Sequence, residues 1–193
     1  MENWGELLLG LTLGLGLSAC CGFRVFIPLL VAAVATKLHL LPVAANFSWL
    51  GSWLAIICFG TAAIAEVMAY YVPVVDHVLD VIAAPAAMIA GTVLSAATLV
   101  HLDPAWQWIL ALMVGGGSAG LIQAGTGLLR FGSAKTTAGL GNPVVATAEN
   151  VAAGVGAIAT LLAPAVMAIV VVLLLLLIIG GINRFFFKKK TTW

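Results

Sequence analysis

Charged residues are scarce in this chain: they make up 8% of its 193 residues, whereas 63% of the residues are hydrophobic. A soluble domain is usually about 25% charged and about 45–50% apolar. The composition therefore excludes an ordinary soluble domain. The net charge is only +1, which gives no electrostatic reason to expect a nucleic-acid partner.

Patterns for metal binding and catalysis are also missing. The three cysteines, Cys20, Cys21 and Cys58, lie in apolar runs, and none belongs to a CxxC or Cys/His metal spacing. The chain has no HExxH motif, its GxSxG string at 116–120 lies inside an apolar segment, and no nucleophile has an obvious neighbouring base. We therefore expect no metal, no other cofactor and no enzyme activity.

The first apolar segment lacks the basic start of a secretory signal peptide. It carries Glu2 and Glu6, and no Lys or Arg precedes Arg24. We therefore predict that this segment is retained as a membrane helix. A lipoprotein-like LSAC string at 17–20 is the alternative, and the apolar continuation beyond Cys20 argues against it.

Apolar runs long enough to cross a bilayer are abundant. A spanning helix needs about 20 apolar residues, so the length allows about six spans and leaves no room for a soluble domain. We predict an all-α fold: one membrane domain, residues 1–193, built as a polytopic transmembrane helix bundle. The predicted segments are 6–21 with a continuation toward 37, 49–71, 73–100, 106–130, 143–163 and 164–184. The join at Ala163 has no turn chemistry, so one long kinked helix and five spans are the alternative.

Basic and tryptophan residues predict the orientation. Arg184 and Lys188–Lys190 follow the last apolar segment, and basic residues collect on the cytoplasmic side, so residues 186–193 are predicted to be a cytoplasmic tail. Six spans would then place both termini in the cytoplasm, in the cell (inner) membrane. Four tryptophans fall at the opposite interface as a one-sided aromatic belt: Trp49, Trp53, Trp106 and Trp108.

Small residues dominate the first and fourth segments. They let membrane helices approach closely, which predicts a tight bundle, or contacts with a second copy or a larger complex through Gly/Ala faces. The glycines at 115–117 are also compatible with an unwound helix near a substrate. Arg, Ala-Glu and Ala-Pro-Ala strings recur in the same order, which suggests inverted repeat halves, 1–100 and 101–185, with broken or re-entrant segments.

The strongest lead to function is a group of ionisable residues in EVMAYYVPVVDHVLD: Glu66, Asp76, His77 and Asp80. A charge inside a membrane segment costs about 2.5–3.5 kcal/mol or more, so these acids need partners, water or protons. Asp76 and Asp80 are four residues apart and share a helix face. They are either interfacial residues in water or a cation or proton site, with His77 as a proton shuttle.

Arg24 has apolar residues on both sides and needs a carboxylate, carbonyl groups or an anionic ligand. We predict that it pairs with a buried carboxylate, Glu149 first and Glu66 second. Glu149 is also a candidate partner for Arg130.

The longest polar stretch is RFGSAKTTAGLGNPVVATAEN, which carries Arg130, Lys135, Asn142 and Glu149. Glycine amides and a helix N-terminus favour anions. It is not a Walker A loop, because Ala134 precedes Lys135. We predict that 130–143 is a loop that folds back toward the membrane and meets the carboxylates, and a solvated loop is the alternative.

Three strings, GLSACCGFRVFIPLL, AEVMAYYVPVVDHVLD and TTAGLGNPVVATAEN, together resemble domain-of-unknown-function family 4126, a family of small polytopic bacterial membrane proteins. The resemblance covers about Gly14 to Pro164 and implies no specific chemistry. It implies that the following are motif positions: Arg24, Glu66, Asp76, His77, Asp80, Asn142, Pro143 and Glu149.

Two classes of function remain. The first is a small transporter or channel for an ion or small solute, whose site is built from the acids, the arginines and the GLGNP loop. The second is a non-transporting accessory or assembly subunit of a larger membrane complex. A wet cavity that reaches Glu66 or Glu149 favours the first, and a dry interior with a large apolar interface favours the second.

Overall fold

The structure is a computed structural model that describes residues 4–71, 73–100, 102–137 and 140–187, without the side chains of 73–78, 80 and 184–187. Its elements are all helical in these ranges, which confirms the predicted all-α class. The elements are α1 (Trp4–Cys21), α2 (Phe26–Lys37), η1 (Ala45–Gly51), α3 (Trp53–Ala69), α4 (Pro73–Thr98), α5 (Pro104–Leu110), η2 (Ala111–Gly116), α6 (Gly117–Thr137), α7 (Asn142–Leu162) and α8 (Pro164–Phe187).

Several helices are long and apolar enough to cross a membrane, so the chain is a multi-pass membrane protein. Five described stretches meet this test: α1, residues 81–98 of α4, the continuous α5–η2–α6 stretch, α7, and residues 164–183 of α8. A sixth is the pair η1 and α3, which is bent by 62°. Ser52 begins α3 by accepting a hydrogen bond from the Ala55 N–H at 3.1 Å, so the bend is a capped helix start.

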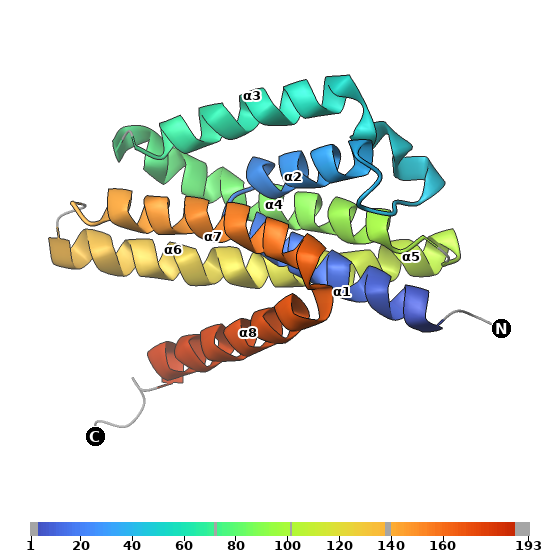
Figure 1. The fold of residues 1–193 in the computed structure, drawn as a ribbon. Coiled ribbons are helices and arrows are strands. Elements are labelled where there is room, and N and C mark those ends of the chain that lie inside the picture. Colours follow the sequence, from blue (N-terminus) through green and yellow to red (C-terminus); the bar gives the residue numbers. More distant parts are fainter. Residues whose placement is uncertain (1–3, 72, 101, 138–139, 188–193) are drawn as a thin grey trace.

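The helices α7 and α8 are separate, so the alternative of one long kinked helix is wrong. Ala163 alone joins them, with φ −144° and ψ 70°, and Pro164 begins the next helix. Proline lacks the N–H that would continue α7, and it is well tolerated in the first turn of α8. In Figure 1, α8 turns back below the bundle and forms a V with α7.

The helices α1 and α2 form a hairpin whose tip lies inside the bundle. Near its two open ends, Gly10 O accepts a hydrogen bond from Thr98 Oγ1, and Ala44 N–H donates to Ala97 O. Both ends of the hairpin therefore lie at the C-terminal end of α4 (Figure 1). The tip at Gly22 packs on Ala119 and Ile122, close to the middle of the α5–η2–α6 stretch.

The hairpin decides where the described chain begins. The tryptophan end of the bundle, where Trp49, Trp53, Trp106 and Trp108 lie, also holds the start of α1, whereas α8 ends at the opposite end, beside the end of α6 (Figure 1). Within the described residues the chain therefore begins and ends at opposite ends of the bundle, and the predicted cytoplasmic placement of both termini stays a prediction.

The tryptophans lie together as predicted. The rings of Phe47 and Trp108 are 5.9 Å apart, which places η1 beside α5 at the tryptophan end. All four tryptophans are exposed on the protein surface, as expected for side chains at a membrane interface.

Close packing of α1, α4 and η2 forms the centre of the bundle. Ser18 Oγ donates a hydrogen bond to Gly91 O at 2.6 Å, and a methyl group on Gly91 would lie 2.7 Å from Gly115 O. The glycines at 115 and 116 end the π-helical turn η2, and Gly117 begins α6 within one continuous helix, so the run is not unwound. Here the small residues serve backbone contact between helices.

Candidate functional site

Arg24 lies at the tip of the hairpin, and its guanidinium group is enclosed by α7. Its Nη1 donates to Glu149 Oε2 at 2.8 Å, and its Nε donates to Asn150 Oδ1 at 2.6 Å. Backbone oxygens accept its other bonds: Ala146 O from Nη2 at 3.2 Å, and Phe23 O from Nη1 at 3.1 Å. Arg24 is 1% exposed and Glu149 is 4% exposed, so the predicted pairing with a buried Glu149 is confirmed.

Arg130 contacts the same carboxylate from α6. Its Nε donates to Glu149 Oε1 at 3.1 Å, and its Nη2 donates to Oε2. The Tyr70 ring, just after α3, contacts both guanidinium groups: its centroid lies 3.8 Å from Arg24 Cζ and 4.2 Å from Arg130 Cζ. We call Arg24, Tyr70, Arg130 and Glu149 the arginine cluster, and all four residues are buried.

Helix geometry explains why these residues meet. Arg130 lies seven residues before the end of α6, and Glu149 lies seven residues after the start of α7. The two helices are antiparallel (Figure 1), and seven residues are about two helical turns, so the two side chains lie opposite each other. Arg24 at the hairpin tip reaches the same carboxylate, because its Nη1 donates to Glu149 Oε2 at 2.8 Å.

Glu66, near the end of α3, binds the first turn of α2. Its Oε1 accepts the Val25 N–H at 2.9 Å, and its Oε2 accepts the Phe26 N–H at 3.0 Å. A helix N-terminus favours negative charge, so Glu66 stabilises the start of α2. Glu66 is the second predicted partner of Arg24, and its hydrogen bonds go instead to the backbone N–H groups of the two residues that follow Arg24.

The polar stretch at 130–143 is mostly helical, so the predicted folded-back loop is wrong. Residues up to Thr137 belong to α6, and α7 begins at Asn142. Thr136 and Thr137 donate their hydroxyl groups to the Ser133 carbonyl inside the helix. These bonds satisfy polar groups that would otherwise favour a loop.

The remaining predicted site residues fall into two groups. Lys135 is exposed on α6 with its Nζ 4.3 Å from the Phe131 ring, apart from the arginine cluster, and Asn142 is buried as the first residue of α7. The side chains of Asp76, His77 and Asp80 lie outside the described residues, so their predicted convergence with Glu66 stays a prediction.

Sequence reasoning missed Tyr70 and Asn150 as members of this site. Both had a signal in the sequence: Tyr70 follows Glu66 by one helical turn, and Asn150 is the neighbour of Glu149. An aromatic ring can bind a guanidinium group through its face, and an amide oxygen can accept from it. A search for partners of a buried arginine therefore has to include these residue types.

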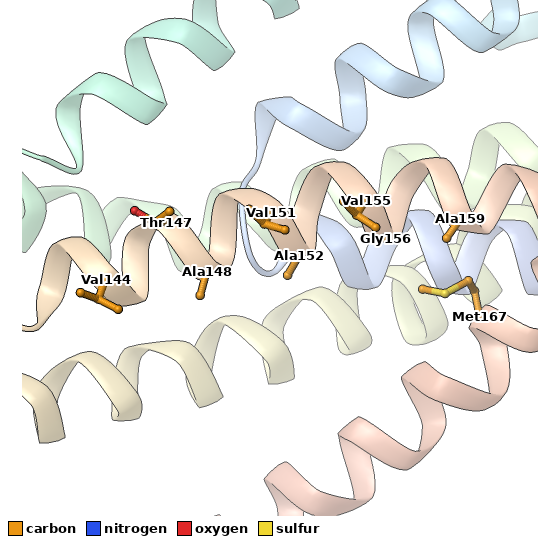
Figure 2. Close-up of a pocket in the computed structure, with 9 residues that line it drawn as sticks. All are labelled: Val144, Thr147, Ala148, Val151, Ala152, Val155, Gly156, Ala159 and Met167. Carbon is orange, nitrogen blue, oxygen red and sulfur yellow. The ribbon is translucent and has the colours of Figure 1, made fainter.

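Two apolar grooves flank α8. One, of about 760 Å³, runs along α7 from Val144 to Ala159 and reaches Met167 of α8 (Figure 2). The other, of about 490 Å³, lies between α6 and α8 and includes Phe23 and Lys135. Neither groove is lined by a residue of the arginine cluster.

The model of the family described as "Domain of unknown function (DUF4126)" matches residues 11–184, which include most of the hairpin, the arginine cluster and most of α8. No curated protein matches the chain, and no solved structure matches it.

Proposed function

We propose that this chain, which belongs to the DUF4126 family, moves an ion or a small solute across the membrane. The proposed site is the arginine cluster. One observation carries the proposal: the hairpin places Arg24 inside the helix bundle, where Glu149 links it to Arg130. Ionisable groups within a membrane protein are expensive and usually functional, which supports the proposal although neither apolar groove described above reaches the cluster.

The hairpin itself supports this proposal. Irregular backbone at membrane depth is tolerated where it is buried in protein or lines a cavity. Transporters use such breaks to present helix ends and charged groups to a substrate. Here the break at 22–25 presents Arg24 and the N-terminus of α2 at one place, and each meets a carboxylate.

Reconstitution into liposomes tests the proposal. We expect solute or ion flux with the wild-type protein and less than about a tenth of it with Arg24→Gln or Glu149→Gln. Lys135→Gln is the matched control, because Lys135 is a basic residue of α6 that lies apart from the cluster. Equal flux in all four proteins would place the pathway elsewhere, and absence of flux for every probe would overturn the proposal.

Orientation is part of the proposed function. The end of the bundle opposite the tryptophans carries Lys135, near the end of α6, and the sequence run Lys188–Lys190 follows α8. We therefore propose that this end is cytoplasmic and that the tryptophan end is outside. In a cysteine-free background, Gly5→Cys and Asn46→Cys should label from outside and Lys135→Cys from inside. Labelling of Gly5→Cys and Lys135→Cys from the same side would contradict the arrangement.

An accessory subunit is the second candidate. The groove along α7 (Figure 2) favours it, because four small residues line it: Ala148, Ala152, Gly156 and Ala159. Small residues let another helix pack closely. Under this function, Ala152→Leu would release the protein from a larger complex in a native gel, and the arginine-cluster variants would leave any flux unchanged.

A further inference from the structure

We propose that the transported solute is a small carboxylate, which takes the position that the Glu149 carboxylate holds between Arg24 and Arg130. This inference rests on the proposed transport function and names its substrate class. It also gives Glu149 a role: its side chain occupies the site when no solute is bound.

The contacts of Glu149 are those that a planar carboxylate requires. Both of its oxygens are used, because Arg130 donates through Nε to one and through Nη2 to the other, side on. Arg24 donates through Nη1 to the second oxygen at 2.8 Å. A guanidinium fork matches a carboxylate in this two-bond geometry, whereas a spherical halide ion cannot use both bonds in the same way.

The site keeps its shape when Glu149 withdraws. Arg24 has three acceptors besides Glu149, namely Asn150 Oδ1 and the carbonyl oxygens of Phe23 and Ala146. Both guanidinium groups also lie on the Tyr70 ring. The donors are therefore held in place by groups other than the carboxylate they bind, and a site that is ordered in advance costs less to fill.

Exchange of one carboxylate for another is the step that would fill the site. The arriving carboxylate accepts the arginine hydrogen bonds as the Glu149 side chain swings out, so the two arginines keep an anionic partner. The groups that face Glu149 are Arg24 from the hairpin, Arg130 from α6, Tyr70 from the end of α3, and Asn150 on α7 itself. The Glu66 carboxylate of α3 accepts the N–H of Val25, the residue after Arg24. The sequence also places Asp76, His77 and Asp80 in the first turns of α4.

The experiment is uptake of radiolabelled pyruvate into proteoliposomes, beside chloride, phosphate, sodium and rubidium ions. Pyruvate is a small carboxylate that stays ionised near neutral pH. We expect uptake of pyruvate at least ten-fold above protein-free liposomes. Arg130→Lys keeps the charge and loses the fork, so uptake should fall at least ten-fold, whereas Lys135→Gln should match the wild type.

A binding measurement keeps the inference testable if Arg130→Lys does not fold. Glu149→Gln removes the competing charge and keeps the side-chain size, so pyruvate should bind this variant at least ten-fold more tightly than the wild type near pH 7. Isothermal titration in detergent measures the two affinities.

The outcomes separate the two proposals. Flux of chloride, phosphate or a cation without pyruvate, lost in Arg24→Gln, would overturn the carboxylate assignment and leave the transport function standing. Weaker pyruvate binding in Glu149→Gln than in the wild type would also overturn the assignment. No flux of any probe in correctly folded wild-type protein would overturn the transport function and the assignment together.

Discussion

The helices α1 and α8 are both apolar and long enough to cross a membrane, but their surroundings are opposite. Half of the α1 residues are buried in the protein, whereas only 11% of the residues 164–183 of α8 are. The more apolar of the two is α8, the exposed one. In a soluble protein the more apolar helix is usually the buried one.

This reversal follows from the solvent. Lipid chains are as apolar as leucine side chains, so exposure of leucine costs α8 nothing. Helices that pack inside the bundle need small residues and satisfied polar groups instead. The hairpin of α1 and α2 has both, with Gly10, Gly14 and Gly16 along α1 and Arg24 at its tip. Between these two helices, the higher hydropathy therefore accompanies contact with lipid and the lower hydropathy accompanies burial in the protein.

The largest predicted effect is at the tip of the hairpin. Arg24→Ala removes one partner of a buried ion pair, which typically costs about 3–5 kcal/mol. Glu149→Gln should cost a similar amount, because it weakens the bonds to both arginines. Thermal unfolding in detergent measures these losses. The Arg24→Ala/Glu149→Gln double variant should lose clearly less than the sum of the single losses, and a full sum would mean that the residues are not coupled.

Part of this fold and site could be read from the sequence. Hydropathy predicts the all-α bundle, and the positions of the tryptophans predict the tryptophan end. The cost of an isolated charge in a membrane predicts the ion pair between Arg24 and Glu149. The hairpin could not be predicted, because the turn at 22–25 interrupts an apolar run of 6–37 with only one glycine. What ends α1 there is packing: Gly22 lies against Ala119 and Ile122 of a helix nearly 100 residues later. Tertiary contact of this kind leaves no local pattern.

The second prediction compares two leucines. Leu17 in α1 is fully buried, and Leu177 in α8 is 73% exposed. Leu17→Ala leaves a cavity in the protein, and such changes cost about 2–5 kcal/mol in soluble cores. We expect Leu17→Ala to lower the free energy of unfolding by about 2 kcal/mol. The surroundings of the bundle are lipid, so no transfer of leucine from water contributes and only the lost packing remains. Lipid fills the space left by Leu177→Ala, so its melting temperature should stay within error of the wild type. An equal loss in both variants would show that α8 is covered by protein.

The third prediction makes the same small change in both helices and is expected to have the smallest effect. A methyl group on Gly10 would lie 2.5 Å from the Thr98 carbonyl oxygen, so Gly10→Ala forces α1 away from α4. Overpacking typically costs about 1–3 kcal/mol, and better helix propensity returns up to about 1 kcal/mol of it. Gly180 in α8 has no other residue within 4 Å of its added methyl group, so Gly180→Ala keeps only the gain in propensity. The melting temperature in detergent should fall for Gly10→Ala and hold or rise slightly for Gly180→Ala. A lower melting temperature for Gly180→Ala and an unchanged one for Gly10→Ala would contradict this assignment. The clash would then lie at α8, the helix that Figure 1 places at the edge of the bundle, and α1 would be the exposed helix.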